Sequence, residues 1–116
     1  AQALFDTHRS HALTLFEFFH TDKVGHERID LAPGVLLERL NRFLERLLDL
    51  LDPVQDTLVV TSDHGNLEDT RHTQHTRNPV PLLAYGWAAP HLADARTLAD
   101  VTPGIVEAFR TGLDGR

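Results

Sequence analysis

The chain has 116 residues, of which 41% are hydrophobic, so it is long enough for one domain with an apolar core and too apolar for general disorder. Its formal net charge of −6 argues against a nucleic-acid surface, which would be basic, and the absence of cysteine excludes disulfides and thiolate metal sites. No apolar run is long enough to cross a membrane and no signal-peptide pattern is present, so we expect a cytoplasmic location.

The first half of the chain predicts a helix end, a strand and a long helix. The chain opens at Ala1 without methionine, and residues 1–8 are typical of the tail of a helix, which favours a fragment of a longer protein. Residues 13–19 are rich in Leu and Phe and predict a mostly buried strand. Residues 33–51 predict the strongest helix, which Pro53 ends. Its apolar stripe, at three- and four-residue spacing, consists of Leu36, Leu40, Phe43, Leu47 and Leu50.

The second half predicts two further strands and a closing helix. Residues 57–61 predict a buried strand, and residues 80–85 predict a third strand, for which Pro79 and Pro81 suggest an edge position or a slow start. Residues 100–110 predict the helix, with Thr102 as its N-cap and Gly112 at its end. This order of elements predicts an α/β fold with a mainly parallel sheet flanked by helices. Such a narrow sheet is incomplete, with one edge unpaired unless another segment or chain supplies further strands. If the chain stands alone, this edge and the exposed helix faces predict a homo-oligomer.

An aspartate and a histidine four residues apart follow the first predicted strand, in Asp22-Lys-Val-Gly-His26. In open α/β sheets ligands bind beyond the C-terminal ends of the strands, and Gly25 would let the backbone turn so that both side chains face one point. The alternative is a strand-to-helix turn in which Asp22 caps the helix. This segment alone leaves the two interpretations open.

Two further polar segments carry candidate ligands. Asp63 and His64 follow the second strand, and the alternative for them is an ordinary Asp-His-Gly turn. His72 and His75 precede the third strand, and for His72 a solvated loop is favoured. In a parallel sheet His75 would lie at the opposite end from the other ligands. Either the third strand runs antiparallel or the loop of residues 67–78 folds back over the sheet edge, and the sequence leaves this open.

Taken together, the three segments predict a metal site. Because the ends of neighbouring strands lie close together, we expect the ligands to converge. The predicted ligands are Asp22, His26, Asp63, His64 and His75. Oxygen and nitrogen ligands without sulfur suit Zn²⁺ or Mn²⁺. These ligands are too many for one tetrahedral ion with an open position, so we expect two divalent ions, an arrangement that suits phosphoryl transfer.

The polar segments resemble the metal motifs of the cofactor-independent (2,3-bisphosphoglycerate-independent) phosphoglycerate mutases, a family of the alkaline phosphatase superfamily. The resemblance rests on residues 22–26, on Thr61-Ser-Asp-His-Gly-Asn-Leu-Glu68, on His72-Thr-Gln-His-Thr-Arg-Asn-Pro-Val-Pro81 and on residues 98–106. It runs from about Leu13 to Phe109, nearly the whole chain. It implies an alkaline-phosphatase-like fold, of which residues 1–116 would be the C-terminal portion, folded as a single domain.

The resemblance also implies roles for the predicted ligands. It assigns one ion to Asp22, His26 and His75 and the second ion to Asp63 and His64. In the family an N-terminal Asp and a Ser or Thr nucleophile complete the second site, and neither motif is visible here. Ser62 precedes the Asp-His pair, a position that is not the nucleophile in the family. We therefore expect no catalytic residue in this chain and no activity from the chain alone, whose metal sites would be incomplete.

The expected function is that of the metal-binding part of a two-metal phosphotransferase or phosphomutase, an isomerase of a small phosphorylated substrate. Lys23 stands where the mutases usually carry an apolar residue, and the loop between Asn66 and His75 is short, so the substrate stays open. The alternatives are a phosphohydrolase, phosphodiesterase or sulfatase-like hydrolase of the same superfamily. A non-catalytic metal-binding remnant, with one ion or none, is a further alternative.

Overall fold

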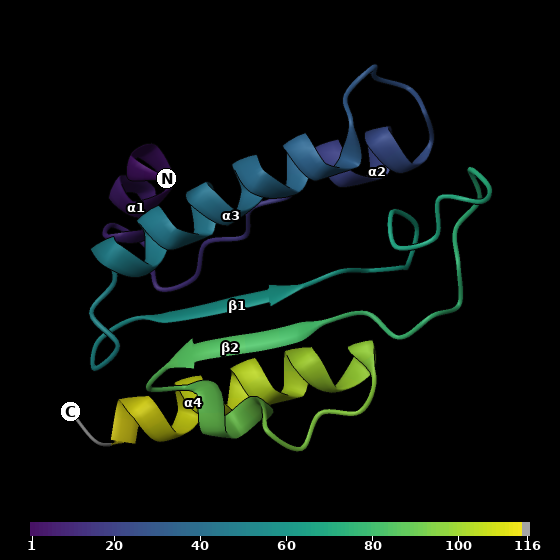
Figure 1. Ribbon diagram of the computed structural model, residues 1–116. Helices are drawn as coiled ribbons and strands as arrows, with labels where there is room; N and C mark the ends of the chain where they lie inside the picture. Colours follow the sequence, from purple (N-terminus) through teal and green to yellow (C-terminus); the bar gives the residue numbers. More distant parts are fainter. Residues whose placement is uncertain (115–116) are drawn as a thin grey trace. The chain divides into compact units, whose positions relative to one another are not determined.

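A computed structural model describes residues 1–114 as a mixture of helices and one small sheet (Figure 1). The elements are α1 (Gln2–His8), α2 (His20–Gly25), α3 (Pro33–Leu50), β1 (Thr57–Thr61), β2 (Leu82–Gly86), the 3-10 helices η1 (Ala89–Leu92) and η2 (Leu98–Asp100), and α4 (Val101–Asp114). The chain divides into two compact units, one of residues 1–51 and 64–80, the other of residues 52–63 and those from 81 onward. Within the described residues, no helix has the length and apolar character needed to span a membrane.

Helix α3 organises the first unit and confirms the longest predicted helix. Pro33 occupies the first turn of α3, where backbone N–H groups have no partner within the helix, so the N–H that proline lacks is not needed there. Leu36 and Leu47 are 1% and 4% exposed, whereas Leu37 and Leu48 on the flanks are 49% and 42% exposed. The helix therefore buries one apolar stripe, and both α1 and α2 pack against it.

The strand predicted for residues 13–19 is wrong. The segment has no regular secondary structure, and the one sheet of the described residues does not include it. Leu15 is 87% exposed. Phe16 and Phe18 stack on Phe43 of α3, with ring centroids 5.5 and 6.4 Å from its ring. A strand needs a neighbouring strand for its backbone N–H and C=O groups, and these ring contacts with a helix supply none.

A short helix, α2, follows this segment. It begins at His20 and ends at Gly25, with His26 as its C-cap. Asp22 lies in the first turn, but no side chain caps the start of the helix, so the alternative in which Asp22 is a cap is also wrong. Residues four apart lie on the same face of a helix, so Asp22 and His26 project to one side.

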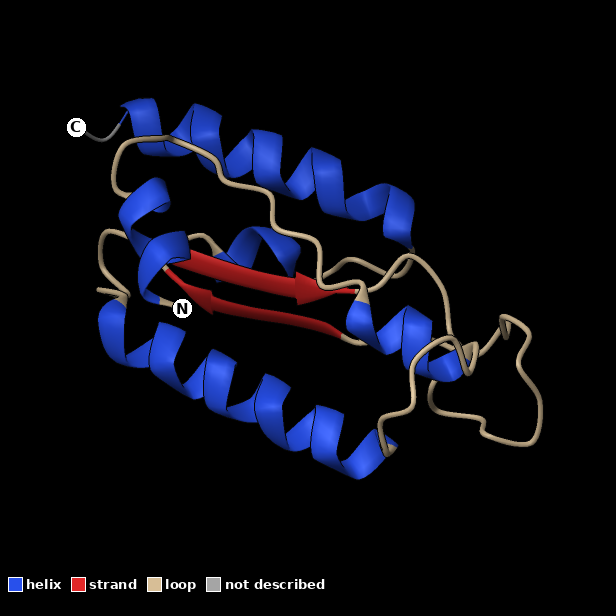
Figure 2. Ribbon diagram, turned by 90° about the horizontal axis from the view of Figure 1, so that it is seen from above, coloured by secondary structure: helices blue, strands red, loops and turns tan. Residues whose placement is uncertain are grey.

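In place of the predicted mainly parallel sheet, the described residues form a sheet of two antiparallel strands (Figure 2). β1 confirms the second predicted strand, and β2 begins at Leu82 rather than at Val80. The last residue of β1, Thr61, pairs with Leu82. Parallel neighbours need a crossover that returns the chain to the starting end of the sheet, and residues 62–81 contain no helix to provide one. This loop therefore leaves and re-enters the sheet at the same end.

The chain after β2 passes through η1 and η2 into α4. A capping box caps the start of η2. In it, Asp100 Oδ2 accepts hydrogen bonds from the backbone N of Thr97 at 2.8 Å and from Thr97 Oγ1 at 2.9 Å. The predicted N-cap at Thr102 is wrong, because α4 already contains this residue. Gly112 does not end the helix either. A Cβ there would lie 2.7 Å from the Trp87 ring, so glycine permits the close packing of α4 on that ring.

Candidate metal centre

Asp22 and His26 form the helical half of a polar cluster in the first unit. His26 Nε2 lies 3.2 Å from Asp22 Oδ1, and both residues are half-buried. On the other side of the ring, Nδ1 lies 2.6 Å from the backbone carbonyl oxygen of Thr73. A carbonyl oxygen only accepts, so Nδ1 is the donor. In the neutral ring the lone pair is then left on Nε2, the nitrogen that faces Asp22.

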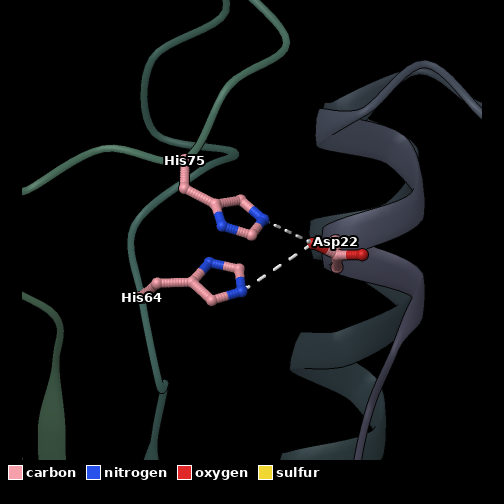
Figure 3. A group of neighbouring side chains, drawn as sticks. All are labelled: Asp22, His64 and His75. Carbon is pink, nitrogen blue, oxygen red and sulfur yellow. Dashed lines mark ion pairs between the residues drawn. The ribbon is translucent and has the colours of Figure 1, made fainter.

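The loop between β1 and β2 supplies two more imidazoles, from His64 and His75. Figure 3 shows both rings directed toward the carboxylate of Asp22, which projects from α2. Their Nε2 atoms lie 3.9 and 3.5 Å from Asp22 Oδ1. The two rings stack, with centroids 3.6 Å apart and planes inclined by 19°. His75 Nε2 also lies 2.9 Å from His26 Nε2, so three imidazole nitrogens surround one carboxylate oxygen.

This donor set fits a divalent cation. Asp22 Oδ1 is buried and accepts no hydrogen bond from the described residues, although the three imidazole nitrogens are near. The lone pair of His26 Nε2 faces this oxygen and also His75 Nε2, an arrangement that needs a proton or a metal ion between the atoms. Nitrogen donors with one carboxylate oxygen suit Zn²⁺ and Mn²⁺. The ligand atoms of Asp22, His64 and His75 lie within 4.8 Å of one another, near enough to share one ion.

The structure brings together four of the five predicted ligands, the imidazole cluster of Asp22, His26, His64 and His75. Asp63 directly precedes His64 in the chain, is exposed and belongs to the second unit. Its grouping with the other four stays a prediction. His72, for which a solvated loop was favoured, is exposed, and its Nε2 lies 3.7 Å from Asp69 Oδ2.

A carboxylate outside the predicted set connects the two halves of the loop of residues 64–80. Glu68 Oε1 accepts hydrogen bonds from Thr76 Oγ1 and from Asn78 Nδ2, the latter at 3.0 Å. Glu68 Oε2 accepts a third, from the backbone N of Asn66 at 2.6 Å. The hydrogen bond from Thr76 is the largest of the causes that lower the pKa of Glu68 to about 2. No spacing pattern could single out this glutamate, because its side-chain partners lie eight and ten positions later in an irregular loop.

An antiparallel bridge reinforces this connection. It joins Gly65 to Thr76, and the backbone N of Thr76 donates to the Gly65 carbonyl oxygen at 2.8 Å. A Cβ on Gly65 would lie 2.1 Å from Thr76 Oγ1, so a side chain at residue 65 would displace the Thr76 hydroxyl from its present position. His64 and His75 immediately precede the bridged residues, so the bridge brings their rings into the same small region.

Comparisons with known proteins place the chain among metalloenzymes. A family model described as the metalloenzyme superfamily matches residues 1–113. The 2,3-bisphosphoglycerate-independent phosphoglycerate mutase of Pseudomonas fluorescens is 30% identical over 107 residues, which are 86% of this chain and 21% of that protein. The mutase of the same name from Paracoccus denitrificans is 34% identical over 111 residues, 88% of this chain and 21% of that protein. The chain spans about a fifth of the length of these relatives. No solved structure matches the chain significantly.

Proposed function

The chain belongs to the metalloenzyme superfamily, and from this membership we propose that it forms the metal-binding part of a two-metal phosphoryl-transfer enzyme of the phosphoglycerate mutase type. The observation that carries the proposal is the convergence of three imidazole nitrogens on Asp22 Oδ1. The segments that carry Asp22 and these three histidines are the segments that resemble the mutase motifs. A buried carboxylate oxygen without a hydrogen bond, facing a histidine lone pair, supports a cation as the missing partner.

We propose that the cations are Mn²⁺ or Zn²⁺. The ligands proposed for one ion are Asp22, His26 and His75, and those proposed for the second are Asp63 and His64. When bound, two such ions polarise a phosphoryl group and stabilise the charge that develops on it. The chain's own contribution is orientation: the hydrogen bond to the Thr73 carbonyl oxygen keeps Nε2 of His26 as the donor atom. Burial of Asp22 Oδ1 keeps water away from that oxygen.

The proposed substrate is a small phosphorylated molecule, and no residue of this chain is proposed as the nucleophile. With a net charge of −6, binding of an anion by this chain would depend on cations that reverse the local field. The same charge makes nucleic acid an unfavourable partner. We further propose a cytoplasmic enzyme of alkaline-phosphatase-like architecture, with this chain as its C-terminal portion. The exposed apolar side chains of residues 13–19 support self-association of the chain by itself.

Calorimetric titration with Zn²⁺ and with Mn²⁺ tests the metal site. The chain is expected to bind at least one of these ions, and His75→Ala is expected to abolish or strongly weaken the binding. His72→Ala is the matched control, because it removes an exposed imidazole from the same loop without touching the cluster. Binding that His75→Ala leaves unchanged would contradict the proposal.

Activity is tested in a longer protein that carries this sequence. There, Asp63→Ala and His75→Ala should each abolish divalent-metal-dependent phosphoryl transfer, because each removes a proposed ligand. Interconversion of 2- and 3-phosphoglycerate and release of inorganic phosphate are measured side by side, which separates a mutase from a hydrolase. Full activity in either variant would refute the assignment of that residue.

A further inference from the structure

We infer that Glu68 is a positioning residue for the imidazole cluster, and that it holds the segments of His64 and His75 together before any cation binds. The consequence for metal affinity rests on the proposed function. The positioning itself is a property of the metal-free chain, so the two can be tested apart.

The three hydrogen bonds of Glu68 join parts of the loop that are otherwise connected by the isolated Gly65–Thr76 bridge. One carboxylate oxygen accepts from the backbone N of Asn66, at 2.6 Å, and the other from the side chains of Thr76 and Asn78. Hydrogen bonds to an ionised acceptor are stronger than those between neutral groups. Glu68 therefore links Asn66, Thr76 and Asn78 through one charged group.

All three contacts lie within three residues of a member of the cluster. Asn66 is two residues after His64, and Thr76 directly follows His75. The Gly65–Thr76 bridge is isolated, with no further ladder pair to strengthen it. Without the Glu68 carboxylate, the segments of His64 and His75 would be held side by side mainly by this single bridge. The stacking of the His64 and His75 rings, with centroids 3.6 Å apart, requires that alignment.

The geometry assigns Glu68 a positioning role rather than that of a further ligand. Both carboxylate oxygens already accept hydrogen bonds from protein donors. The carboxylate also packs on the Gly65 backbone: a Cβ on that residue would lie 2.5 Å from Glu68 Oε1. A cation that recruited Glu68 would have to break these bonds, whereas the oxygen of Asp22 has none to break.

The first test is the contact between the His64 and His75 rings in the metal-free chain, observed as a nuclear Overhauser effect between their ring protons. Glu68→Ala is expected to abolish it. Glu68→Gln is expected to restore much of it, because the amide oxygen still accepts from Thr76 and Asn78. Glu45→Ala is the matched control, since Glu45 is exposed and accepts its hydrogen bond from Asn41 within the same helix. A full-strength contact in Glu68→Ala overturns the inference.

Far-UV circular dichroism shows whether the Glu68→Ala chain still folds. If it does not, a second variant keeps the inference testable. Thr76→Val removes the hydroxyl that donates to Glu68 and keeps the carboxylate. It is expected to weaken the same ring contact. A contact unchanged in a folded Thr76→Val chain also counts against the inference.

The second test is the Zn²⁺ affinity of the same variants, for which we expect a loss of about 10-fold in Glu68→Ala and none in Glu45→Ala. A wild-type chain that binds neither Zn²⁺ nor Mn²⁺, but whose ring contact disappears in Glu68→Ala, would refute the proposed metal site and support the positioning role. A wild-type chain that binds Zn²⁺, with affinity and ring contact both unchanged in Glu68→Ala, would overturn the positioning role alone.

Discussion

The hydrogen bond from His26 Nδ1 to the backbone carbonyl oxygen of Thr73 joins helix α2 to the loop that follows β1. The two residues are 47 positions apart in the chain, and the bond is 2.6 Å long. It holds the helical and loop parts of the imidazole cluster together and determines which nitrogen of His26 can receive a cation. Its consequence for the tautomer of His26 can be measured directly.

In the neutral form, His26 should carry its proton on Nδ1. His72 provides an internal control with the opposite expectation, because its Nδ1 accepts a hydrogen bond from the backbone N of Gln74 at 3.3 Å and its proton should be on Nε2. Long-range ¹H–¹⁵N correlation spectra distinguish the two tautomers. Zn²⁺ should then shift the Nε2 resonance of His26 and leave that of His72 in place. A proton on Nε2 of neutral His26 would contradict the arrangement.

Gly25 should not tolerate a side chain. A Cβ at this position would lie 1.3 Å from Asn66 Oδ1, and Asn66 is 6% exposed. We expect Gly25→Ala to lower the free energy of unfolding by roughly 1–3 kcal/mol, measured by urea unfolding. Gly34→Ala is the control, because nothing lies within 4 Å of its Cβ position. In the double variant Gly25→Ala/Asn66→Ala the loss should be smaller than the sum of the single losses, and strict additivity would argue against the clash.

Leu36 should dominate the stability of the first unit. It is 1% exposed, and Leu36→Ala is expected to cost about 2–5 kcal/mol through lost burial and a cavity. Leu37, the next residue on the same helix, is 49% exposed, so Leu37→Ala should cost less than about 1 kcal/mol. Chemical unfolding of both variants compares the two sides of α3. Equal losses would mean that the buried stripe does not support the unit.

Acid should weaken the chain in part through Glu68. In the folded chain its pKa is about 2, below the ordinary value of 4.5, chiefly because Thr76 donates a hydrogen bond to the carboxylate. A lowered pKa means that the unfolded chain binds the proton more readily, so the stabilisation is complete above pH 4.5 and is lost as the pH falls through 2. The effect is small because Glu68 is exposed. The difference in unfolding free energy between wild type and Glu68→Gln should shrink over this range, and a constant difference would contradict the assignment.

The helix α3 and the strand β1, which depend on local spacing, were predicted correctly from the sequence, whereas the predicted ends of α4 were not. The apolar stripe that contains Leu36 and Leu47 specifies α3, because the spacing that makes one face apolar is a property of the helix itself. The run of β-branched and apolar residues at 57–61 specifies β1 in the same way. The resemblance to the mutases is confirmed by the family and by the relatives that match, because the motif residues are contiguous along the chain.

Features that depend on a distant partner were predicted only in part. Residues 13–19 have the composition of a strand, but a strand exists only where a second backbone supplies its hydrogen bonds. The cluster assembles by a route different from the expected one, since Asp22 lies in α2 and His26 is the C-cap of that helix, and no strand precedes them in the described residues. The antiparallel direction of β2, which the sequence left open, explains how His75 can lie beside His64. Glu68 and its partners were missed because their contacts connect irregular segments.

The affinity and number of bound ions should show that His64 and Asp63 have different roles in the isolated chain. The resemblance assigns both to the second ion, yet His64 stacks on His75 and faces Asp22. If the nucleophile and further ligands come from another segment, the chain alone should bind one ion, and Asp63→Ala should leave that affinity unchanged. His64→Ala should weaken it, because the ring supports His75 even where it does not bind the ion. Calorimetry with Zn²⁺ gives both the affinity and the stoichiometry. Two tight sites in the wild-type chain, with one lost in Asp63→Ala, would show instead that this chain completes the second site by itself.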